Sequence, residues 1–249
     1  MLILHGLFGS ARNWQAVAQR LATRRRVLTV DLRNHGDSPQ SGAHDYPAMA
    51  GDVLALIHRL HLQDVTVVGH SMGGKAAMWL ALQQPQAISR LVVVDIAPVT
   101  YPDHFGKLID ALLQLPIAEI SSRNEADRRL EAAIPDPALR QFLLQNLART
   151  DNGFRWRPNL AALRANRHHV VGFPAPRPGA RFPGPTLFIR GACSDAVMDA
   201  YIPTIQHYFP AATVATIDGT GHWPHAERPQ AFFEVLSGFI VRSGRPGGI

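Results

Sequence analysis

The segment Gly69-His70-Ser71-Met72-Gly73 is a G-x-S-x-G motif, a pattern typical of serine nucleophiles. An apolar run precedes it and a helical pattern follows it, and this strand–turn–helix context gives the motif its meaning. A tight turn there would present the Ser71 hydroxyl above the strand, and the start of the following helix would add a positive field. The alternative is an ordinary turn bounded by glycines. We expect Ser71 to be the nucleophile of an acyl-transfer reaction.

A serine hydroxyl is a weak nucleophile at neutral pH, so it needs a histidine base that is itself oriented by an acid. Among 12 histidines, His222 stands out because it lies between the last expected strand and the last helix, at the same sheet edge as Ser71. The alternative is a surface histidine in a loop. The side chain of His70 is expected to point away from the hydroxyl, and His225 with Glu227 is expected to cap the last helix.

Two aspartates are candidates for the acid. Asp95 ends the strand after the nucleophile helix, and Asp195 follows the first strand beyond a long insertion. Both preserve the chain order serine, aspartate, histidine, and either loop could reach His222. Each could instead be a solvated aspartate in a turn, so the residues alone leave both open.

Acyl transfer also needs hydrogen-bond donors for the oxyanion, each worth about 100- to 1000-fold in rate. The backbone amide of Met72, directly after the nucleophile, is one candidate. The amide of Leu7, in the loop after the first strand, is the other. His5-Gly6 would keep that loop tight, although a plain glycine turn is the alternative.

Strand and helix patterns alternate along the chain, which predicts an α/β fold with a mostly parallel sheet flanked by helices. Because carboxyl ends of parallel strands share one sheet edge, the candidate residues should meet there. Expected strands span residues 1–4, 27–30, 65–68, 91–94, 186–190 and 213–217. Expected helices span residues 13–22 with Asn13 as the cap, about 49–60, 72–84, 200–208 and 230–241.

The alternation stops between residues 99 and 182, where the pattern is mainly helical. We therefore expect a core domain of residues 1–98 and 183–249, with residues 99–182 as a helical cap over Ser71. The proline- and glycine-rich run Gly172–Pro185 is typical of a connector, and Ser243–Ile249 of a frayed tail. Phe8, Met72 and Trp223 are expected to line an acyl pocket under the cap, with core packing as the alternative for each.

Taken together, these segments resemble the α/β-hydrolase fold, and more narrowly the small bacterial acyl esterases related to mammalian abhydrolase domain-containing protein eleven. The resemblance covers almost the whole chain. It rests on residues 5–10 (His-Gly-Leu-Phe-Gly-Ser), 31–36 with Asn34 where many hydrolases have glycine, 69–75, 95–98 and 221–227.

The resemblance implies that Asp95 is the acid, since in that group the acid follows the strand after the nucleophile. Ser194, not an aspartate, stands where the commoner hydrolase pattern has its acid, and neighbouring Asp195 remains the alternative. The family also implies two further strands before the His5-Gly6 loop. We expect either a late start of this sequence or a sheet that lacks its N-terminal edge strands, whose apolar edge something else covers.

Composition limits the classes of partner. The chain has 249 residues, 46% hydrophobic and 18% charged, which suits one domain with a full core. No uncharged apolar run approaches the roughly 18 residues of a membrane span, so we expect a cytoplasmic protein. A single cysteine, Cys193, excludes a disulfide framework and a thiolate metal cluster. The net charge of +6 does not indicate nucleic acid, because the arginines are scattered without interleaved aromatic residues.

The expected function is therefore hydrolysis of carboxylic esters or thioesters of small to medium acyl chains through an acyl-enzyme, with no metal or cofactor. Residues 99–182 hold 12 basic and eight acidic residues, which favours acidic substrates at the entrance. A carbon–carbon bond hydrolase or lyase with the same three residues is the alternative enzyme. A non-catalytic ligand-binding receptor on this scaffold is the alternative of another class. Related dehalogenases and epoxide hydrolases carry aspartate where this chain has Ser71.

Overall fold

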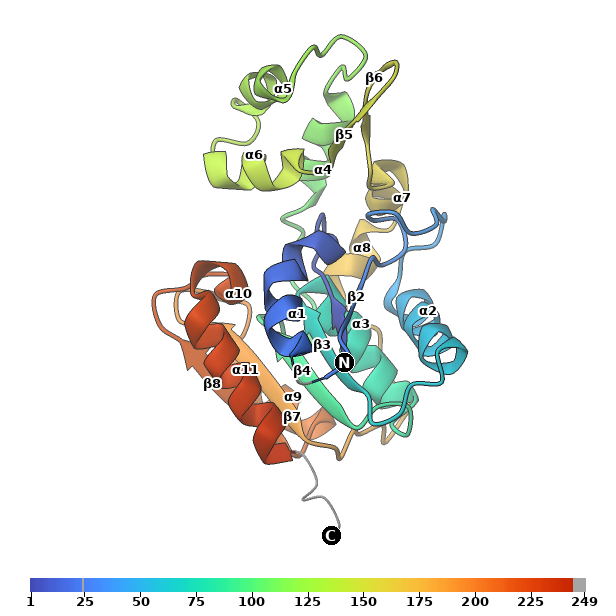
Figure 1. The fold of residues 1–249 in the computed structure, drawn as a ribbon, viewed down its shortest axis with the longest axis vertical. Helices are drawn as coiled ribbons and strands as arrows, with labels where there is room; N and C mark the ends of the chain where they lie inside the picture. The colour runs from blue at the N-terminus through green and yellow to red at the C-terminus, as the bar shows by residue number, and fades with distance from the viewer. Residues whose placement is uncertain (24, 244–249) are drawn as a thin grey trace.

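A computed structural model describes residues 1–23 and 25–243, and within them six strands form the central sheet (Figure 1). Their order across the sheet is β2-β1-β3-β4-β7-β8, and every neighbouring pair is parallel. The expected parallel α/β architecture is confirmed. The strands are β1 (Leu2–Leu4), β2 (Leu28–Val30), β3 (Thr66–His70), β4 (Arg90–Val94), β7 (Thr186–Gly191) and β8 (Ala212–Ile217).

Helices cover both faces of this sheet, which explains why β3 and β4 are buried along their whole length. Alternate valines of one strand point to opposite faces: Val67 belongs to one core cluster and Val68 to the other. The Val67 side packs against α2 (Tyr46–Arg59), α3 (Met72–Gln83) and α9 (Ile202–Tyr208). The Val68 side packs against α1 (Gln15–Ala22) and α11 (Pro229–Ser243).

The first helical segment begins earlier than expected. A 3-10 turn, η1 (Ala11–Trp14), precedes α1, and Ser10 occupies the capping position. The Ser10 amide donates to Asn13 Oδ1 at 2.7 Å, so Asn13 lies inside the first turn and is not the cap. A second short 3-10 turn, η2 (Asp199–Tyr201), precedes α9.

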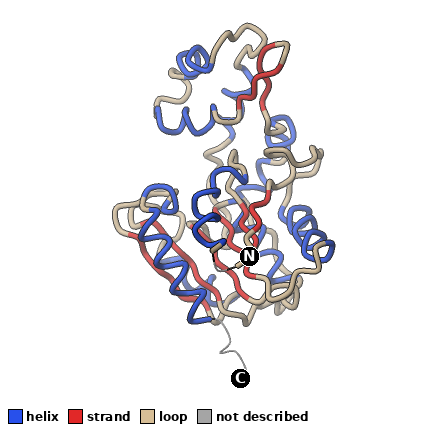
Figure 2. Tube along the Cα trace, in the orientation of Figure 1, coloured by secondary structure: helices blue, strands red, loops and turns tan. Residues whose placement is uncertain are grey.

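Residues 99–182 form an insertion between β4 and β7, and most of it lies beyond one end of the sheet (Figure 1). The segment is mainly helical, as expected, but it also contains a hairpin that the sequence did not indicate. An antiparallel hairpin of β5 (Leu147–Thr150) and β6 (Gly153–Trp156) stands apart from the central sheet, as Figure 2 shows. Gly153, at a φ of 117°, supplies a backbone conformation that this turn needs. The helices are α4 (Gly106–Gln114), α5 (Arg123–Leu130), α6 (Pro137–Leu144), α7 (Leu160–Ala165) and α8 (Arg167–Val171).

The first strand of the chain is not at the edge of the sheet: β1 is an inner strand, and β2 is the edge strand. Within the described residues no strand pairs with the outer side of β2, whose residues are half-buried. Apart from Ser243 at the end of α11, the expected frayed tail lies outside the described residues. None of the described helices combines the length and the apolar character that crossing a bilayer requires.

Candidate active site

The turn between β3 and α3 holds Ser71 in a conformation that side chains rarely adopt, with φ 51° and ψ −117°. A β-carbon on Gly69 would lie 2.3 Å from the carbonyl oxygen of Gly73, and one on Gly73 would lie 2.5 Å from that of His5. Both glycines are therefore required for the backbone to close this turn. The Ser71 amide donates to the Val94 carbonyl at 3.0 Å, which ties the turn to the end of β4.

A hydrogen-bonded chain connects Ser71, His222 and Asp95. His222 Nε2 lies 3.0 Å from Ser71 Oγ, and His222 Nδ1 lies 2.8 Å from Asp95 Oδ2. With Nδ1–H donating to the carboxylate, Nε2 is left to accept the serine proton. The structure thus brings together the three residues that the sequence proposed, from the ends of β3, β4 and β8.

Asp95 is fully buried, and two further donors fix its carboxylate. The Gly191 amide donates to Oδ1 at 2.9 Å and the Ser194 hydroxyl donates to Oδ2 at 2.5 Å. Sequence reasoning singled out Ser194 as the position of a missing acid but missed this contact. Asp195 is exposed and lines the nearby cavity, and it makes no hydrogen bond to His222 within the described residues.

Two side chains that sequence reasoning assigned elsewhere hold the loop of His222. His70 is neutral because burial lowers its pKa well below the ordinary value. Its Nε2–H donates to the carbonyl of His222 at 2.8 Å. Glu227 accepts the amides of Gly221 at 2.7 Å and Trp223 at 3.0 Å. The sequence offered only a weak signal for this role: Glu227 follows Gly221 and Trp223 by a few residues, and such a spacing is common in loops.

His225 was expected to cap the last helix with Glu227, and this is wrong. Its ring stacks on Trp14 with centroids 4.1 Å apart and an interplanar angle of 9°. Burial lowers the pKa of His225 to about 3, so the ring is neutral and packs as part of the core beneath the His222 loop.

The loop after β1 holds a backbone amide, that of Leu7, without a partner among the described residues. The carbonyl of Gly6 accepts His5 Nδ1–H at 2.8 Å and the Gly9 amide at 2.9 Å. Since a trans peptide points its N–H opposite to its C=O, the Leu7 amide faces the other way. The next amide, of Phe8, donates to His35 Nε2 at 3.2 Å. Leu7 N–H is therefore available to a ligand.

Two buried neutral histidines brace this loop against residues 31–36. Burial lowers the pKa of both His5 and His35, and their rings lie 5.1 Å apart. His5 Nε2 accepts the Leu32 amide at 3.0 Å, while His35 Nδ1–H donates to the Arg33 carbonyl at 3.1 Å. The histidines of the two motifs thus position the loop that carries Leu7.

Ser71 opens into a cavity of about 360 Å³ between the core and the two ends of the insertion. Its lining includes Leu7 and Met72, the residues of the two candidate amide donors, together with His222. No group of three or more histidine, cysteine, aspartate or glutamate side chains in the described part of the chain is arranged to hold a metal ion. The apolar and aromatic residues in the rest of the lining are Tyr46, Ile96, Tyr101, Pro102, Phe105, Val170, Val171, Ala196, Met198 and Tyr201.

Phe8 and Trp223, expected in this pocket, do not line it. Phe8 has a φ of 60°, which turns its buried side chain to a second cavity on the other side of the loop. Trp223 leans away from the cavity and packs on Phe142 of α6, with ring centroids 5.9 Å apart. Neither orientation follows from their positions next to Leu7 and His222 in the sequence.

Lys75, one turn into α3, is a buried cation on the cavity wall. Its Nζ donates to the carbonyls of Val171 at 2.9 Å and Gly172 at 2.7 Å, which fastens the end of the insertion to the nucleophile helix. The ammonium also lies 4.7 Å from the ring centroid of Tyr101. Burial lowers the pKa of Lys75 to about 7.

We expect this burial to make stability depend on pH. Above pH 7 the folded protein loses the Lys75 proton, whereas the unfolded chain keeps it up to a pKa of about 10.4. The unfolded state then binds more protons, so this group raises the free energy of unfolding with pH, by at most about 1.4 kcal/mol per pH unit. Urea unfolding of wild type and Lys75→Met, measured between pH 6 and 10, should show that the free energy of unfolding of wild type rises relative to that of the variant as the pH rises. Parallel curves would contradict this expectation.

Comparison with known proteins places the chain in a family. The sequence model described as "Alpha/beta hydrolase family" matches residues 1–235. The chain belongs to the alpha/beta hydrolase family. It is similar to mouse "sn-1-specific diacylglycerol lipase ABHD11", with 42% identity over 97% of this chain and 80% of that protein. It is also similar to the Escherichia coli "Esterase YbfF", with 33% identity over 96% of this chain and 92% of that protein.

A solved structure titled "Marine microorganism esterase" superposes with a TM-score of 0.91 and 37% identity, over 96% of this chain and 94% of that one. The resemblance to α/β-hydrolase esterases inferred from the motifs is confirmed, and so is the assignment of the chain as a hydrolase enzyme.

Proposed function

We propose that this alpha/beta hydrolase is a serine hydrolase that cleaves carboxylic esters or thioesters of small to medium acyl chains through an acyl-enzyme. The observation that carries the proposal is the unbroken hydrogen-bonded chain from buried Asp95 through His222 to Ser71 at the wall of a cavity. The same geometry favours Asp95 over Asp195 as the acid.

In the acylation half of the reaction, His222 Nε2 takes the Ser71 proton as Oγ attacks the acyl carbonyl carbon. Asp95 keeps the imidazole in the productive tautomer and stabilises the imidazolium that forms. The developing oxyanion accepts hydrogen bonds from the amides of Leu7 and Met72. The imidazolium then gives its proton to the departing alcohol or thiol, which leaves Ser71 acylated.

In the deacylation half, a water molecule attacks the acyl carbonyl while His222 removes its proton. The tetrahedral intermediate collapses, the proton returns to Ser71 Oγ, and the carboxylic acid leaves.

Met72 is the first residue of α3, so its amide has no partner within the helix. The positive end of the helix also adds to the stabilisation of the oxyanion.

The cavity supports an acyl group as the bound part of the substrate. Its volume of about 360 Å³ lies at the small end of ligand pockets, and aliphatic and aromatic side chains dominate its walls. Relatives named as a lipase and as an esterase support ester substrates.

Hydrolysis of p-nitrophenyl esters from acetate to palmitate, and of an acyl thioester, tests the proposal. We expect turnover that Ser71→Ala abolishes, with the highest kcat/KM at short to medium chains because the cavity limits acyl length. Equal rates for wild type and Ser71→Ala would overturn the serine mechanism, and a maximum at palmitate would overturn the assignment of the acyl site.

A further inference from the structure

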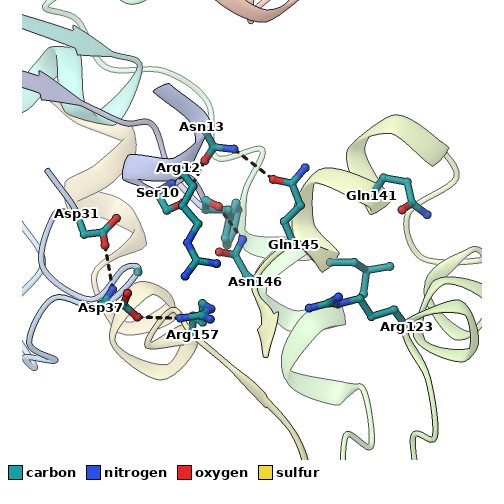
Figure 3. A pocket seen from close by; sticks show the side chains of 13 residues that line it. Ser10, Arg12, Asn13, Asp31, Asp37, Arg123, Gln141, Gln145, Asn146 and Arg157 are labelled. Atoms are coloured by element: carbon teal, nitrogen blue, oxygen red, sulfur yellow. Dashed lines mark hydrogen bonds and ion pairs between the residues drawn. The ribbon is translucent and has the colours of Figure 1, made fainter. Parts of the chain in front are cut away.

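A second cavity, of about 410 Å³, is lined in part by Phe8, the residue after Leu7, and Figure 3 shows it from close by. Three arginines line it, from three separate elements: Arg12 in η1, Arg123 at the start of α5 and Arg157 after β6. We name it the arginine cavity. Most of its lining residues are polar or charged, whereas most of those around Ser71 are apolar or aromatic.

The charges around the arginine cavity are not balanced within the protein. Asp31 accepts backbone amides through both oxygens, from Ala11 at 2.7 Å and from Asp37 at 3.0 Å. Asp37 pairs with Arg157 at 2.8 Å. The carboxylates that line this cavity are thus engaged away from Arg12 and Arg123.

Two guanidinium groups remain without a carboxylate. Arg123 is held by the carbonyl of Leu147, through Nε at 3.2 Å and Nη2 at 2.9 Å, which is a neutral acceptor. The Arg12 guanidinium has no hydrogen bond or ion pair to another described residue. In Figure 3 the side chains of Arg12 and Arg123 extend from opposite sides toward the same space. Both residues are solvent-exposed, so an anion in that space would replace water as their partner, and a guanidinium fork matches the geometry of a phosphate or carboxylate.

The arginine cavity and the Ser71 cavity share one wall. Leu7 lines the cavity of Ser71, and Phe8, the next residue, lines the arginine cavity. Buried Asn146 fixes this wall by donating its Nδ2–H to the Phe8 carbonyl at 2.7 Å. To reach the arginines, a substrate with its acyl group beside Ser71 must extend its leaving group over the Leu7–Phe8 turn.

We propose that the arginine cavity binds an anionic group, phosphate or carboxylate, on the leaving-group side of the ester or thioester substrate. This inference rests on the proposed function. It assigns Arg12 and Arg123 as the residues that select anionic substrates.

Matched thioesters test the selection. S-butyryl-4′-phosphopantetheine and S-butyrylpantetheine share acyl group, thioester and chain, and differ in one phosphate. We expect wild type to favour the phosphorylated compound by about tenfold or more in kcat/KM, mainly through KM, since hydrogen bonds to charged groups are strong. S-butyrylglutathione supplies carboxylates instead, and a preference for it over S-butyrylpantetheine identifies carboxylate as the anion.

Arginine variants tie any preference to this cavity. Arg12→Gln and Arg123→Gln should each bring the ratio of the two kcat/KM values toward one. Arg149→Gln removes an equal charge from an exposed position of the insertion outside the cavity and should keep the ratio. A ratio near one in wild type, or a full ratio in both cavity variants, would overturn the proposal.

A binding measurement separates this inference from the hydrolytic mechanism. Calorimetry on the Ser71→Ala protein should show 4′-phosphopantetheine binding more tightly than pantetheine, with the difference lost in Ser71→Ala/Arg12→Gln. Equal binding of the two compounds would overturn the anion site even if esters are hydrolysed. Selective binding without any hydrolysis by wild type would retain the anion site and overturn the proposed function. Binding of inorganic phosphate alone, with no preference between the thioesters, would overturn the role in substrate selection.

Discussion

Replacing His222 by alanine is expected to lower kcat for p-nitrophenyl butyrate about 10⁶-fold, the scale on which a serine hydrolase responds to loss of its base. Without the imidazole, no other described side chain hydrogen-bonds the Ser71 hydroxyl, and the proton of the attacking serine has no acceptor. Steady-state kinetics at saturating ester measures the effect.

The fold should tolerate this change, since the His222 side chain is about a third exposed and its loop is held independently by His70 and Glu227. His58→Ala, on an exposed position of α2, is the matched control and should retain wild-type kcat. A loss of less than about tenfold in the His222 variant, with its melting temperature preserved, would contradict the assignment of the base.

Replacing Asp95 by asparagine is expected to lower kcat about 10⁴-fold, because an amide in place of the carboxylate favours the wrong histidine tautomer. The side-chain NH₂ can donate to His222 Nδ1, which then moves the ring proton to Nε2, the atom that must accept from Ser71. The Gly191 amide and the Ser194 hydroxyl still need an acceptor, and the new side chain offers them only its single amide oxygen.

Asp195→Asn is the control for this variant, because Asp195 is an exposed carboxylate only one residue beyond Ser194. We expect its kcat to fall far less, by under about tenfold, because Asp195 makes no hydrogen bond to His222 or Ser71 and its replacement changes only the electrostatic potential in the cavity. A larger loss in Asp195→Asn than in Asp95→Asn would reverse the assignment of the acid.

The fold and the main site residues were accessible from the sequence because their signals are local. Gly69 and Gly73 mark a turn that only glycines can close, and the valines of β3 and β4 mark strands buried on both faces. Once the strands are parallel, Ser71, Asp95 and His222 must share one sheet edge, whatever the details of packing.

What the sequence did not predict depends on contacts between distant segments or on unusual backbone angles. The hydrogen bond from His70 to the His222 carbonyl joins residues 152 positions apart. Phe8 points to the arginine cavity because of a positive φ, which an aromatic residue rarely adopts. The choice between Asp95 and Asp195 likewise needed the spatial path of two loops, and the hairpin β5–β6 was masked by the helical pattern on either side of it.

Covalent labelling tests the central claim most directly. The protein is treated with a fluorophosphonate, whose phosphorus is attacked by an activated serine as an acyl carbonyl is, and the modified peptide is located by mass spectrometry. The mechanism predicts one adduct per chain, on Ser71, formed in step with the loss of ester hydrolysis and absent in His222→Ala within the same time. An adduct on another residue that accounts for the inactivation, or full hydrolytic activity with Ser71 modified, would contradict it.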